Sequence, residues 1–424
     1  THQMGQFRIR SPNTGGGSQF GPFDGSNRGR GASKGLRPYS GPVDVTFASS
    51  SHSSLGIEVE LSLVDADTGA LVSVAGTVLA ELAAQRGGAE HPRIKPELYE
   101  CTLEVITGVC DHVAEARADL EGSIAELREV LEPRGVDVIC TGLHPFTPWQ
   151  SQTRSTGQRY DDLVDRIQWP AKRLITHGIH YHVGVRSAEK SIAITNAVSN
   201  YLPMFLALSS SSPYWHGIDT GLASARTKVF EALPSTGLPP RLADWGEFEG
   251  FMAALIKAGS IASIREVWWD IRPHPTFGTI ELRMCDAMPT MTEICALAAF
   301  AQSLGERFDQ LLDRGYSLPV GNDWILRENK WRAARHGLEA SVVVDPSGRT
   351  RPIANLIEET IDELMPIARR LDCAAELNDV MNILETGSSA ARQRRVLESH
   401  GTLLDVVHSL RAEFRTDTPG ARFR

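Results

Sequence analysis

The 424-residue chain lacks the cysteine pattern of a zinc ribbon or a disulfide scaffold. Its six cysteines are dispersed and form no C-x-x-C pair, which favours a reducing cytoplasm. No run approaches the roughly 18 consecutive apolar residues that span a bilayer, and the first residues lack the apolar stretch of a signal peptide. We therefore expect a cytoplasmic protein that is not held in a membrane.

An excess of basic charge is also absent. The formal net charge is −9, which argues against binding to nucleic acid or to an anionic membrane surface. The sequence contains no G-x-x-x-x-G-K-[ST] and no G-x-G-x-x-G motif, so any nucleotide must bind by another geometry. The length suits one large domain or two, with an ordinary hydrophobic fraction of 42%.

Residues 1–50 have few large aliphatic side chains and are rich in Gly, Ser, Asn and Arg. Such a segment buries too little apolar surface to offset its ordering entropy, so we predict that it is disordered. Its arginines lack the interleaved aromatic residues of a nucleic-acid platform, and an added expression leader explains its composition equally well. We expect residues 51–424 to form a single domain.

From residue 55 onward, strand-like stretches alternate with stretches of helical periodicity. The elements are not in strict βαβ order, because pairs of helices often separate the strands. The strands also have one charged face, which favours an α+β fold with an antiparallel sheet over a parallel one. The expected helices cover residues 75–85, 112–131, 159–173, 190–208, 245–258, 292–314, 324–337, 353–371 and 390–414.

Four short segments place acidic, histidine or arginine residues at every second position, between apolar residues. Because successive side chains of a strand point to opposite faces, alternate residues share a face. The other face of each strand is largely apolar. The pairs predicted to share the polar face are Glu58 with Glu60, Glu100 with Glu104, His180 with His182, and Glu281 with Arg283.

A sheet face with this many carboxylates and imidazoles predicts a bound cation. Without one, the like charges would repel each other and lose hydration on burial. Oxygen-rich sites suit Mg²⁺, and histidine ligands shift the preference toward Mn²⁺. A solvated outer face alternates in the same way and is the simpler interpretation of any single segment. The occurrence of four such segments favours the cation site.

Several arginines lie in segments that suit ligand binding, and each has a structural alternative. Arg272 suits bidentate binding of a substrate carboxylate, or it clamps a loop by stacking on tryptophan. Arg226 binds an anion or lies at the surface. Arg332, on a basic helix, meets phosphates or is solvated. Arg392 follows a helix start whose N–H groups hold an anion or are simply capped.

Taken in order, the motifs resemble the YbdK carboxylate–amine ligase family, the type 2 glutamate–cysteine ligases. The family pattern includes a Gly-x-Glu-x-Glu strand, a Gly-x-His-x-His-Val-Gly strand, a Trp-Trp-Asp-x-Arg-Pro loop and a Phe-Gly-Thr-x-Glu-x-Arg strand. Seven motifs in one order are a specific signal that covers nearly the whole chain from residue 55. They stand here at residues 56–60, 103–107, 178–184, 268–273, 277–283, 328–333 and 390–394.

The resemblance implies a glutamine-synthetase-like fold, in which a curved antiparallel sheet forms a funnel with helices on its outer face. Residues 51–424 would be one ligase catalytic domain that binds ATP and Mg²⁺ or Mn²⁺. The catalytic residues implied are Arg283, at the transferred phosphate, and Arg272. The implied metal ligands are Glu58, Glu60, Glu104, His180 and Glu281. The implied contacts to substrate or nucleotide are Arg226, Arg332, Arg392 and Arg394.

Two features depart from the family pattern. His177 stands where the family often has cysteine, and it is either an additional ligand or a loop residue. Ser388 and Ala391 replace the usual asparagine and aspartate of the C-terminal motif, which bears on nucleotide contacts there.

The expected function is ATP-dependent formation of a C–N bond. Glutamate, or a related acid, is activated as an acyl phosphate at its γ-carboxylate, and the amine of cysteine or another amine attacks it. Arginines and cations suffice for this chemistry, and no protein nucleophile is needed. The alternatives are a metal-dependent amide or phosphate hydrolase and a catalytically silent nucleotide-binding homologue. Family members are often dimeric, so we expect a homodimer.

Overall fold

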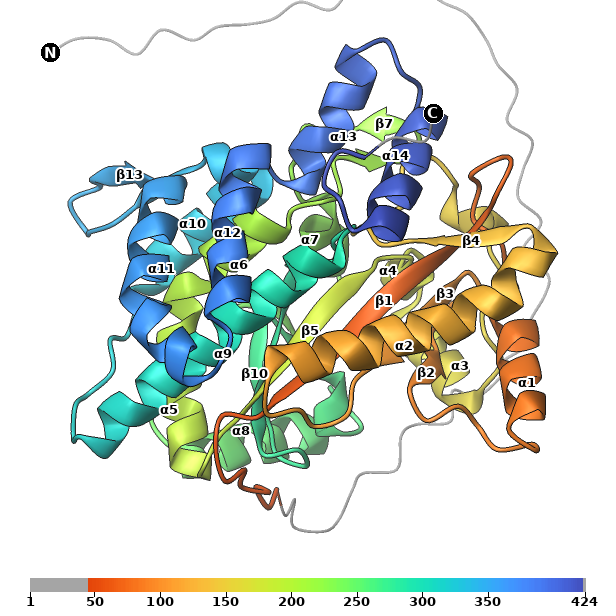
Figure 1. Cartoon of the computed structure of the whole chain (residues 1–424). Helices are drawn as coiled ribbons and strands as arrows, with labels where there is room; N and C mark the ends of the chain where they lie inside the picture. The colour runs from red at the N-terminus through yellow and green to blue at the C-terminus, as the bar shows by residue number, and fades with distance from the viewer. Residues whose placement is uncertain (1–44, 422–424) are drawn as a thin grey trace, which may run out of the picture. The chain divides into compact units, whose positions relative to one another are not determined.

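The computed structural model describes residues 45–421, whose centre is a seven-stranded antiparallel sheet (Figure 1). Its order is β10-β11-β5-β1-β3-β2, with β4 paired to β1, so β10 and β2 are edges and the sheet is open. The strands of this sheet are β1 (Leu55–Asp65), β2 (Ile94–Pro96), β3 (Thr102–Ile106), β4 (Val136–Ile139), β5 (Gly178–Gly184), β10 (Ile271–His274) and β11 (Thr279–Asp286). Short pairs are formed by β6 (Tyr214–Trp215) with β7 (Ile218–Asp219), β8 (Thr236–Gly237) with β9 (Trp268–Trp269), and β12 (Ser341–Val343) with β13 (Thr350–Pro352).

Most expected helices are present, and six of them end within one residue of the predicted bounds. Two helices, α7 and α12, were not predicted. The helices are α1 (Ala75–Gln85), α2 (Val113–Leu131), α3 (Gln158–Ile167), α4 (Trp169–Lys172), α5 (Ala188–Val198), α6 (Leu202–Ser209), α7 (Ala225–Phe230), α8 (Trp245–Lys257), α9 (Met291–Asp313), α10 (Asp323–His336), α11 (Ile353–Arg370), α12 (Ala374–Thr386), α13 (Ser389–Glu398) and α14 (Leu403–Thr416).

Three predicted helices are each divided in two. The helix expected at 159–173 breaks at Gln168, which has a φ of 62° and precedes Pro170. The one expected at 190–208 passes through a 3₁₀ turn and resumes with a proline in its first turn, where proline is tolerated. The one expected at 390–414 is interrupted between α13 and α14. Apolar spacing continues across these breaks because both halves bury residues, so the pattern did not reveal them.

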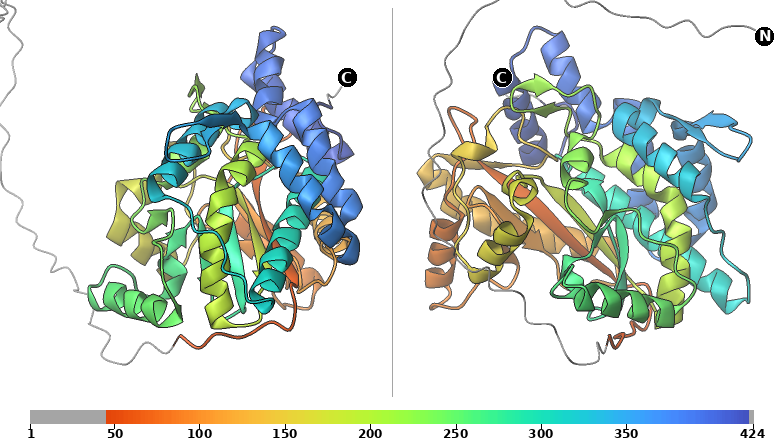
Figure 2. Two further views of the ribbon diagram at one scale, coloured as in Figure 1. Left: turned by 90° about the vertical axis from the view of Figure 1, so that its left-hand side faces the viewer. Right: turned by 180° about the vertical axis from the view of Figure 1, so that it is seen from behind.

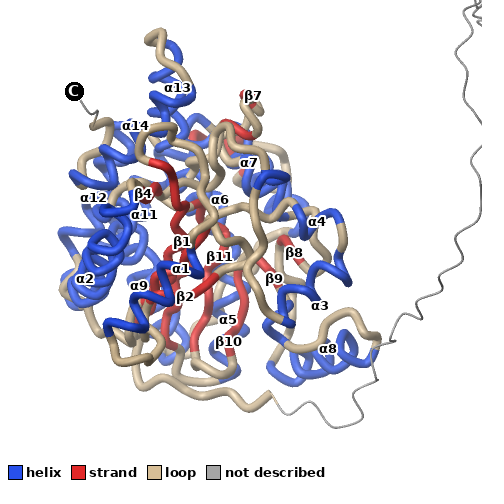
Figure 3. Tube along the Cα trace, turned by 90° about the vertical axis from the view of Figure 1, so that its right-hand side faces the viewer, coloured by secondary structure: helices blue, strands red, loops and turns tan. Residues whose placement is uncertain are grey.

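The apolar face of the sheet packs on α2 and α9. Val59 of β1 and Tyr181 of β5 point to this side and are fully buried. The Tyr181 hydroxyl donates a hydrogen bond of 3.0 Å to the carbonyl of Ile294 in α9. The strands lie between these helices on one side and α3, α4 and α8 on the other (Figure 3). Seen from behind, α3, α4 and α8 lie in front of the opposite, polar face (Figure 2).

The predicted fold class, α+β with an antiparallel sheet and helices on its outer face, is confirmed. The chain divides into Thr1–Pro38, which lies outside the described residues together with the rest of 1–44, and Tyr39–Arg424. The prediction of disorder up to residue 50 is wrong for residues 45–50. Val45 is buried in an apolar cluster, and the Ala48 amide donates to the Pro275 carbonyl at 2.8 Å. Two apolar residues, Val45 and Phe47, are enough to anchor a segment whose composition is otherwise polar.

One helical stretch of the described chain, Ala188–Ser209, has the length and composition of a membrane span. It comprises α5 and α6, and 72% of its most apolar window is buried inside the protein. Buried core helices of soluble proteins meet the same criteria.

Candidate active site

The polar face of the sheet collects the acidic and histidine residues that sequence alternation predicted. Antiparallel register sets Glu58 of β1 opposite His180 of β5, and Glu281 of β11 opposite His182. Glu60 lies opposite Glu104 of β3. The side chains of four strands that are far apart in sequence therefore meet on one surface.

Three sets of ligand atoms lie close enough to share a cation. The members of each set offer atoms within 4.8 Å of one another. The sets are Glu58 with His182 and Glu281, Glu58 with Glu104 and His180, and Glu60 with Glu97 and Glu104. All five predicted metal ligands belong to at least one set, and the structure adds His182 and Glu97 to them. We call these seven residues the acidic cluster.

Glu97 was missed because it lies outside any alternating strand. It follows Pro96, the last residue of the three-residue strand β2, and its carboxylate accepts a hydrogen bond from the Leu98 amide at 3.1 Å. So short a strand shows no period. His182 was recognised as sharing a face with His180, but it was not assigned to the metal ligands.

The predicted pairing of Glu100 with Glu104 on one face is wrong. Strand β3 begins at Thr102, so Glu100 lies before it. The Glu100 carboxylate instead accepts a hydrogen bond of 2.6 Å from the amide of Gly76, in the first turn of α1. A carboxylate is favourable there because helix N-terminal N–H groups carry partial positive charge. Glu100 is a helix cap and takes no part in the acidic cluster.

The all-carboxylate set is electrostatically strained without a cation. Burial raises the pKa of Glu60 to about 7, and the neighbouring Glu97 adds to the effect. Burial likewise raises the pKa of Glu97, and it raises that of Glu104 well above its usual range, with Glu58 and Glu97 contributing. Three buried carboxylates whose pKa values are all raised form a site that a divalent cation would neutralise.

For His180 and Glu58 of the acidic cluster, the pKa shifts run in the opposite direction, toward lower values. Burial and the Arg283 charge lower the pKa of His180 to about 4, so it is neutral and suited to bind a metal. Burial by itself raises the pKa of Glu58, but its contacts with His180 and His182 lower it overall. The Nε2 atom of His182 is buried and lacks a hydrogen bond, although it lies 3.3 Å from a Glu58 oxygen.

Glu281 is held by two arginines. Its carboxylate accepts hydrogen bonds from Arg272 Nε at 2.6 Å and from Arg283 Nη1. Burial alone raises the pKa of Glu281, but these two guanidinium groups lower it well below its usual range. Glu281 is therefore ionised and oriented before any ligand binds.

Arg272 serves mainly to position Glu281. Its Nη1 donates to the backbone carbonyls of Val267 at 2.7 Å and Ile264 at 3.1 Å, while its Nε is taken by Glu281. Only Nη2 is left, so the predicted bidentate contact of Arg272 with a substrate carboxylate is wrong. Arg283 differs, because its buried Nε atom has no hydrogen-bond partner and remains available.

Arg226 of α7 is a buried arginine without a close partner. Its Nη1 lies 3.9 Å from Asp286, its Nη2 is 3.5 Å from the Arg283 carbonyl, and its Nε makes no hydrogen bond. Gly178 makes room for it, since a Cβ there would lie 2.1 Å from Arg226 Nη2. The Gly178 amide also donates to Glu60 at 2.6 Å. The glycine before the histidine pair is thus required to bring Arg226 and Glu60 together.

His177 is a structural residue below the acidic cluster. Burial lowers its pKa to about 3, so the ring is neutral. Its nitrogens lie within hydrogen-bonding distance of the Ser62 and Thr102 hydroxyls, at 3.2 and 3.0 Å. Ser62 lies two residues after Glu60, and Thr102 lies two residues before Glu104. Both hydroxyls are therefore on the sheet face that carries these two glutamates. Of the two predicted roles, the loop residue fits its position just before β5, and none of the three ligand sets includes it.

The remaining predicted arginines lie outside the acidic cluster. Arg392 is fully buried, and its three nitrogens bond to Glu293 and Glu413, so its predicted contact with a nucleotide is wrong. Arg332 donates to Glu328 and to the Ser341 carbonyl. Arg394 donates to Asp219 and to the Leu222 carbonyl. Both are partly exposed, and their contacts with a substrate or nucleotide stay predictions.

The motif at residues 328–333 lies on α10, and its Lys330 contacts the segment that precedes β11. The Lys330 ammonium, almost fully buried, lies 2.5 Å from Asp270 and 2.6 Å from Glu231. The Asp270 carbonyl in turn accepts the Arg283 amide at 2.7 Å. This chain of contacts fixes the backbone that carries Arg283.

The residues present fit a divalent cation. The raised pKa values of Glu60, Glu97 and Glu104 and the orphaned Nε2 of His182 both indicate missing positive charge. The all-oxygen set suits Mg²⁺, and the two histidine-containing sets also suit Mn²⁺. The choice between the two ions stays a prediction.

Removal of divalent cations is expected to destabilise the protein increasingly as the pH rises. The pKa of Glu60 is about 7 against 4.5 for an ordinary glutamate, so its protonated form stabilises the fold fully below about pH 4.5. That contribution is lost as the pH rises through about 7, where a cation would replace the proton. We expect MgCl₂ to raise the melting temperature over an EDTA-treated sample by roughly 5 °C at about pH 8 and by little at about pH 5. Thermal scans of wild type and Glu60→Gln across this range measure it, and an equal shift at both pH values would contradict the site.

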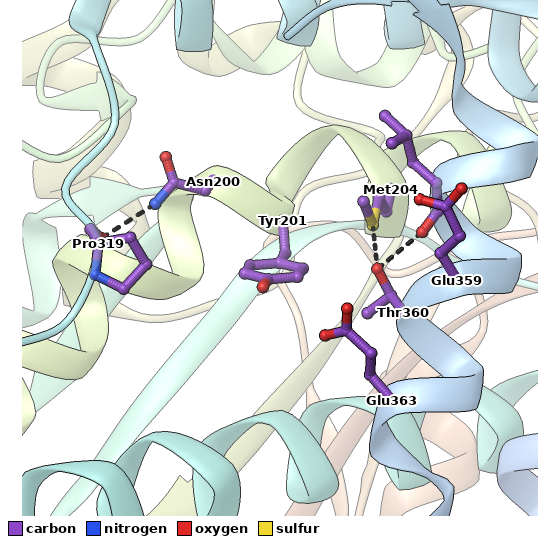
Figure 4. Close-up of a pocket in the computed structure, with 8 residues that line it drawn as sticks. Asn200, Tyr201, Met204, Pro319, Glu359, Thr360 and Glu363 are labelled. Atoms are coloured by element: carbon purple, nitrogen blue, oxygen red, sulfur yellow. Dashed lines mark hydrogen bonds between the residues drawn. The ribbon is translucent and has the colours of Figure 1, made fainter. Parts of the chain in front are cut away.

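A cavity of about 370 Å³ lies away from this site, between the α5–α6 region and α11 (Figure 4). Its lining includes Tyr201, Met204, Glu359 and Glu363, none of which belongs to the acidic cluster. A second cavity, of about 340 Å³, is lined by Tyr99, Trp149 and residues of α3 and α4.

The open antiparallel sheet thus carries clustered carboxylates and histidines with arginines beside them, an arrangement that suits an enzyme acting on anionic substrates. The model of glutamate–cysteine ligase family 2 (GCS2) matches residues 54–409. The chain belongs to this family, as the resemblance of its motifs implied. It is therefore an enzyme of the glutamate–cysteine ligase type, a carboxylate–amine ligase.

Curated relatives extend over almost the whole described chain. A protein of Frankia casuarinae, provisionally named glutamate–cysteine ligase 2-1, is 50% identical over 378 residues, covering 89% of this chain and 99% of the relative. A protein of Thermobifida fusca, provisionally named glutamate–cysteine ligase 2, is 48% identical over 377 residues, covering 89% and 94%.

Two solved structures share the fold. Glutamate–cysteine ligase of Francisella tularensis, in complex with AMP, has a TM-score of 0.62 at 15% identity and covers 87% of this chain and 90% of that one. A bifunctional glutathione synthetase of Pasteurella multocida has a TM-score of 0.61 at 14% identity and covers 86% and 52%. Together with the sheet topology, they confirm the predicted glutamine-synthetase-like fold class.

Proposed function

We propose that this chain is an ATP- and Mg²⁺-dependent ligase that joins the γ-carboxylate of glutamate to the amino group of cysteine. The observation that carries the proposal is the acidic cluster with buried, incompletely paired Arg226 and Arg283 beside it. Family membership supports the ligase class, and the AMP bound to the Francisella ligase supports use of an adenine nucleotide.

In the first step, a γ-carboxylate oxygen of glutamate attacks the γ-phosphorus of ATP. The bond from that phosphorus to the β,γ-bridging oxygen breaks, and ADP leaves with the electron pair. Arg283 and Arg226 offer N–H groups to the charge that spreads over the transferring phosphoryl oxygens. Because both guanidinium groups are buried, they act in a region where water screens them little.

In the second step, the amine attacks the carbonyl carbon of the acyl phosphate. The carbon–oxygen bond to phosphate breaks, inorganic phosphate leaves with the electron pair, and the nitrogen loses a proton. The protein needs to hold the two substrates in line and keep water from the acyl phosphate. Mg²⁺ or Mn²⁺ held by the acidic cluster would neutralise phosphate charge throughout.

ADP release by the purified protein with ATP and Mg²⁺ tests the proposal. Reactions contain glutamate alone, cysteine alone, both together, and glutamate with a pool of other amines; aspartate replaces glutamate as a matched control acid. We expect ADP only when glutamate and one amine are present, with mass spectrometry showing the condensed amide.

The other outcomes correspond to the alternatives. Hydrolysis of amide or phosphate substrates without ATP would indicate a metal-dependent hydrolase. Nucleotide binding without turnover in any mixture would indicate a catalytically silent homologue. ADP release that depends on neither acid nor amine would also contradict the ligase.

A further inference from the structure

An exposed aromatic ring lies at the edge of the acidic cluster. Phe277, in the turn between β10 and β11, is 57% exposed. Its ring stacks on that of His274, with centroids 4.2 Å apart and an interplanar angle of 10°. It also meets the ring of His182 edge to face at 5.6 Å, and His274 meets His182 in the same way at 5.5 Å. We call Phe277 and His274 the aromatic wall.

The turn that carries the aromatic wall is held in place from outside. β10 and β11 form one side of the sheet (Figure 3), and residues 275–278 join them. The Ala48 amide donates to the Pro275 carbonyl at 2.8 Å. The Ser50 hydroxyl donates to the Gly278 carbonyl at 3.0 Å. Gly278 has a φ of 65°, and a Cβ there would lie 1.4 Å from the Ala48 carbonyl oxygen, so the close approach requires glycine.

We propose that the aromatic wall contacts the side chain of the acceptor amine and selects an apolar or sulfur-containing one. The inference rests on the ligase reaction proposed above. The attacking nitrogen must come within about 3.5 Å of the acyl carbon. Cations that neutralise the acyl phosphate would be held by ligand sets of the acidic cluster, one of which includes His182. The side chain of the amine then lies near His182, where Phe277 offers an exposed apolar surface.

The chemistry of the three substrates favours the acceptor at this position. A thiol or methyl group gains from contact with an aromatic ring, and sulfur does so at the ring edge. Glutamate has charged groups at both ends, which suit the arginines better than an apolar ring. The adenine of ATP could stack on an aromatic ring, but the ribose and two phosphates separate it from the γ-phosphorus that reacts beside the acidic cluster.

Rates of ADP release with four acceptors test the proposal. They are L-cysteine, L-2-aminobutyrate with a methyl group in place of the thiol, L-serine with a hydroxyl group there, and glycine without a side chain. Each is titrated at saturating ATP, Mg²⁺ and glutamate. The variants are Phe277→Ala, which removes the ring, and Phe277→Leu, which keeps an apolar side chain. Tyr316→Ala is the control, because Tyr316 is 61% exposed and belongs to neither the acidic cluster nor the aromatic wall. Melting temperatures show whether each variant is folded.

In the wild type, we expect kcat/KM for cysteine and 2-aminobutyrate to exceed that for glycine by about 10-fold or more, with serine close to glycine. Phe277→Ala should lower the first two values by about 10-fold and leave kcat/KM for glycine within about twofold. Phe277→Leu should lie between, because it keeps part of the apolar surface. The KM values for ATP and glutamate should not change in any variant, and Tyr316→Ala should match the wild type.

Three results with Phe277→Ala would overturn the proposal: an equal loss for all four acceptors, a rise in KM for ATP or glutamate, or unchanged ratios between acceptors. An absence of turnover with every amine would contradict the proposed function instead. Isothermal titration of 2-aminobutyrate into protein with glutamate, Mg²⁺ and the β,γ-imido analogue of ATP would then test the aromatic wall directly. Binding that Phe277→Ala weakens by about 10-fold supports the wall, whereas equal affinity or no binding up to roughly 10 mM overturns it.

Discussion

Glu58→Gln is expected to lower the ligase rate by more than about a hundredfold while leaving the melting temperature nearly unchanged. Glu58 belongs to two of the three ligand sets, one with His182 and Glu281 and one with Glu104 and His180. Loss of a hydrogen-bond partner behind a metal ligand costs about 10- to 100-fold, so loss of a ligand shared by two sets should cost more. Glutamine keeps the shape of the side chain, which is partly exposed. Initial rates of ADP release over a Mg²⁺ titration measure the effect.

Glu100→Gln is the matched control. Glu100 has the same side chain and lies on the adjoining segment, but it caps α1 through the Gly76 amide. We expect full activity and a loss of at most about 1 kcal/mol in unfolding free energy. A Glu58→Gln enzyme with a near-normal rate would show that the acidic cluster is assigned incorrectly, as would equal losses in the two variants.

Glu281→Gln tests the acidic cluster less cleanly than Glu58→Gln does. The alternation predicts a loss of activity with the fold intact. In the structure, Glu281 is also the buried partner of Arg272 and Arg283. Breaking such a pair typically costs about 3–5 kcal/mol, so stability and activity should fall together.

Arg226→Met is expected to lower kcat/KM by about a hundredfold to a thousandfold, with little change in stability. Removal of one preorganised donor to a developing anion costs about this much. The fold loses little, because the polar contacts of the Arg226 side chain are all 3.5 Å or longer, and its 3.0 Å hydrogen bond to Ser212 is made by the backbone amide, which methionine keeps. Asp286, its nearest carboxylate, keeps hydrogen bonds from Ser212 and Ser224. Steady-state kinetics with varied ATP, together with urea unfolding, separate the two effects.

Arg394→Met serves as the control for Arg226→Met. Arg394 was, like Arg226, an implied contact to substrate or nucleotide, but it lies outside the acidic cluster and is paired with Asp219 near the surface. A loss of activity for Arg394→Met equal to that for Arg226→Met would show a general need for basic residues. A large stability loss with unchanged kinetics for Arg226→Met would make Arg226 a structural residue.

The parts of the site that sequence could predict are those with a local period. The positions of Glu58, Glu60, His180 and Glu281 follow from alternation alone, because a strand sets side-chain direction residue by residue. The prediction for Glu100 failed for a local reason too, because strand β3 begins two residues after it. Pattern alone did not show where β3 starts.

Other parts could not be predicted because they depend on partners distant in sequence. From the sequence, Arg392 and Arg226 were both predicted to bind a ligand or to lie at the surface. In the structure Arg392 is enclosed by Glu293 and Glu413, whereas Arg226 has no close carboxylate. The difference lies in which helices pack against each arginine.

Consecutive residues were enough to predict the α+β class, the polar sheet face and membership of the ligase family, because the period of a strand and the order of motifs are local properties of a chain. Folding was needed to bring Glu97 into the acidic cluster, to place Arg272 against Glu281 and to bury Arg392 in ion pairs. Charge and hydrogen bonding act through space, so a side chain's partner, and with it its pKa and its availability to a ligand, exists only once the chain is folded.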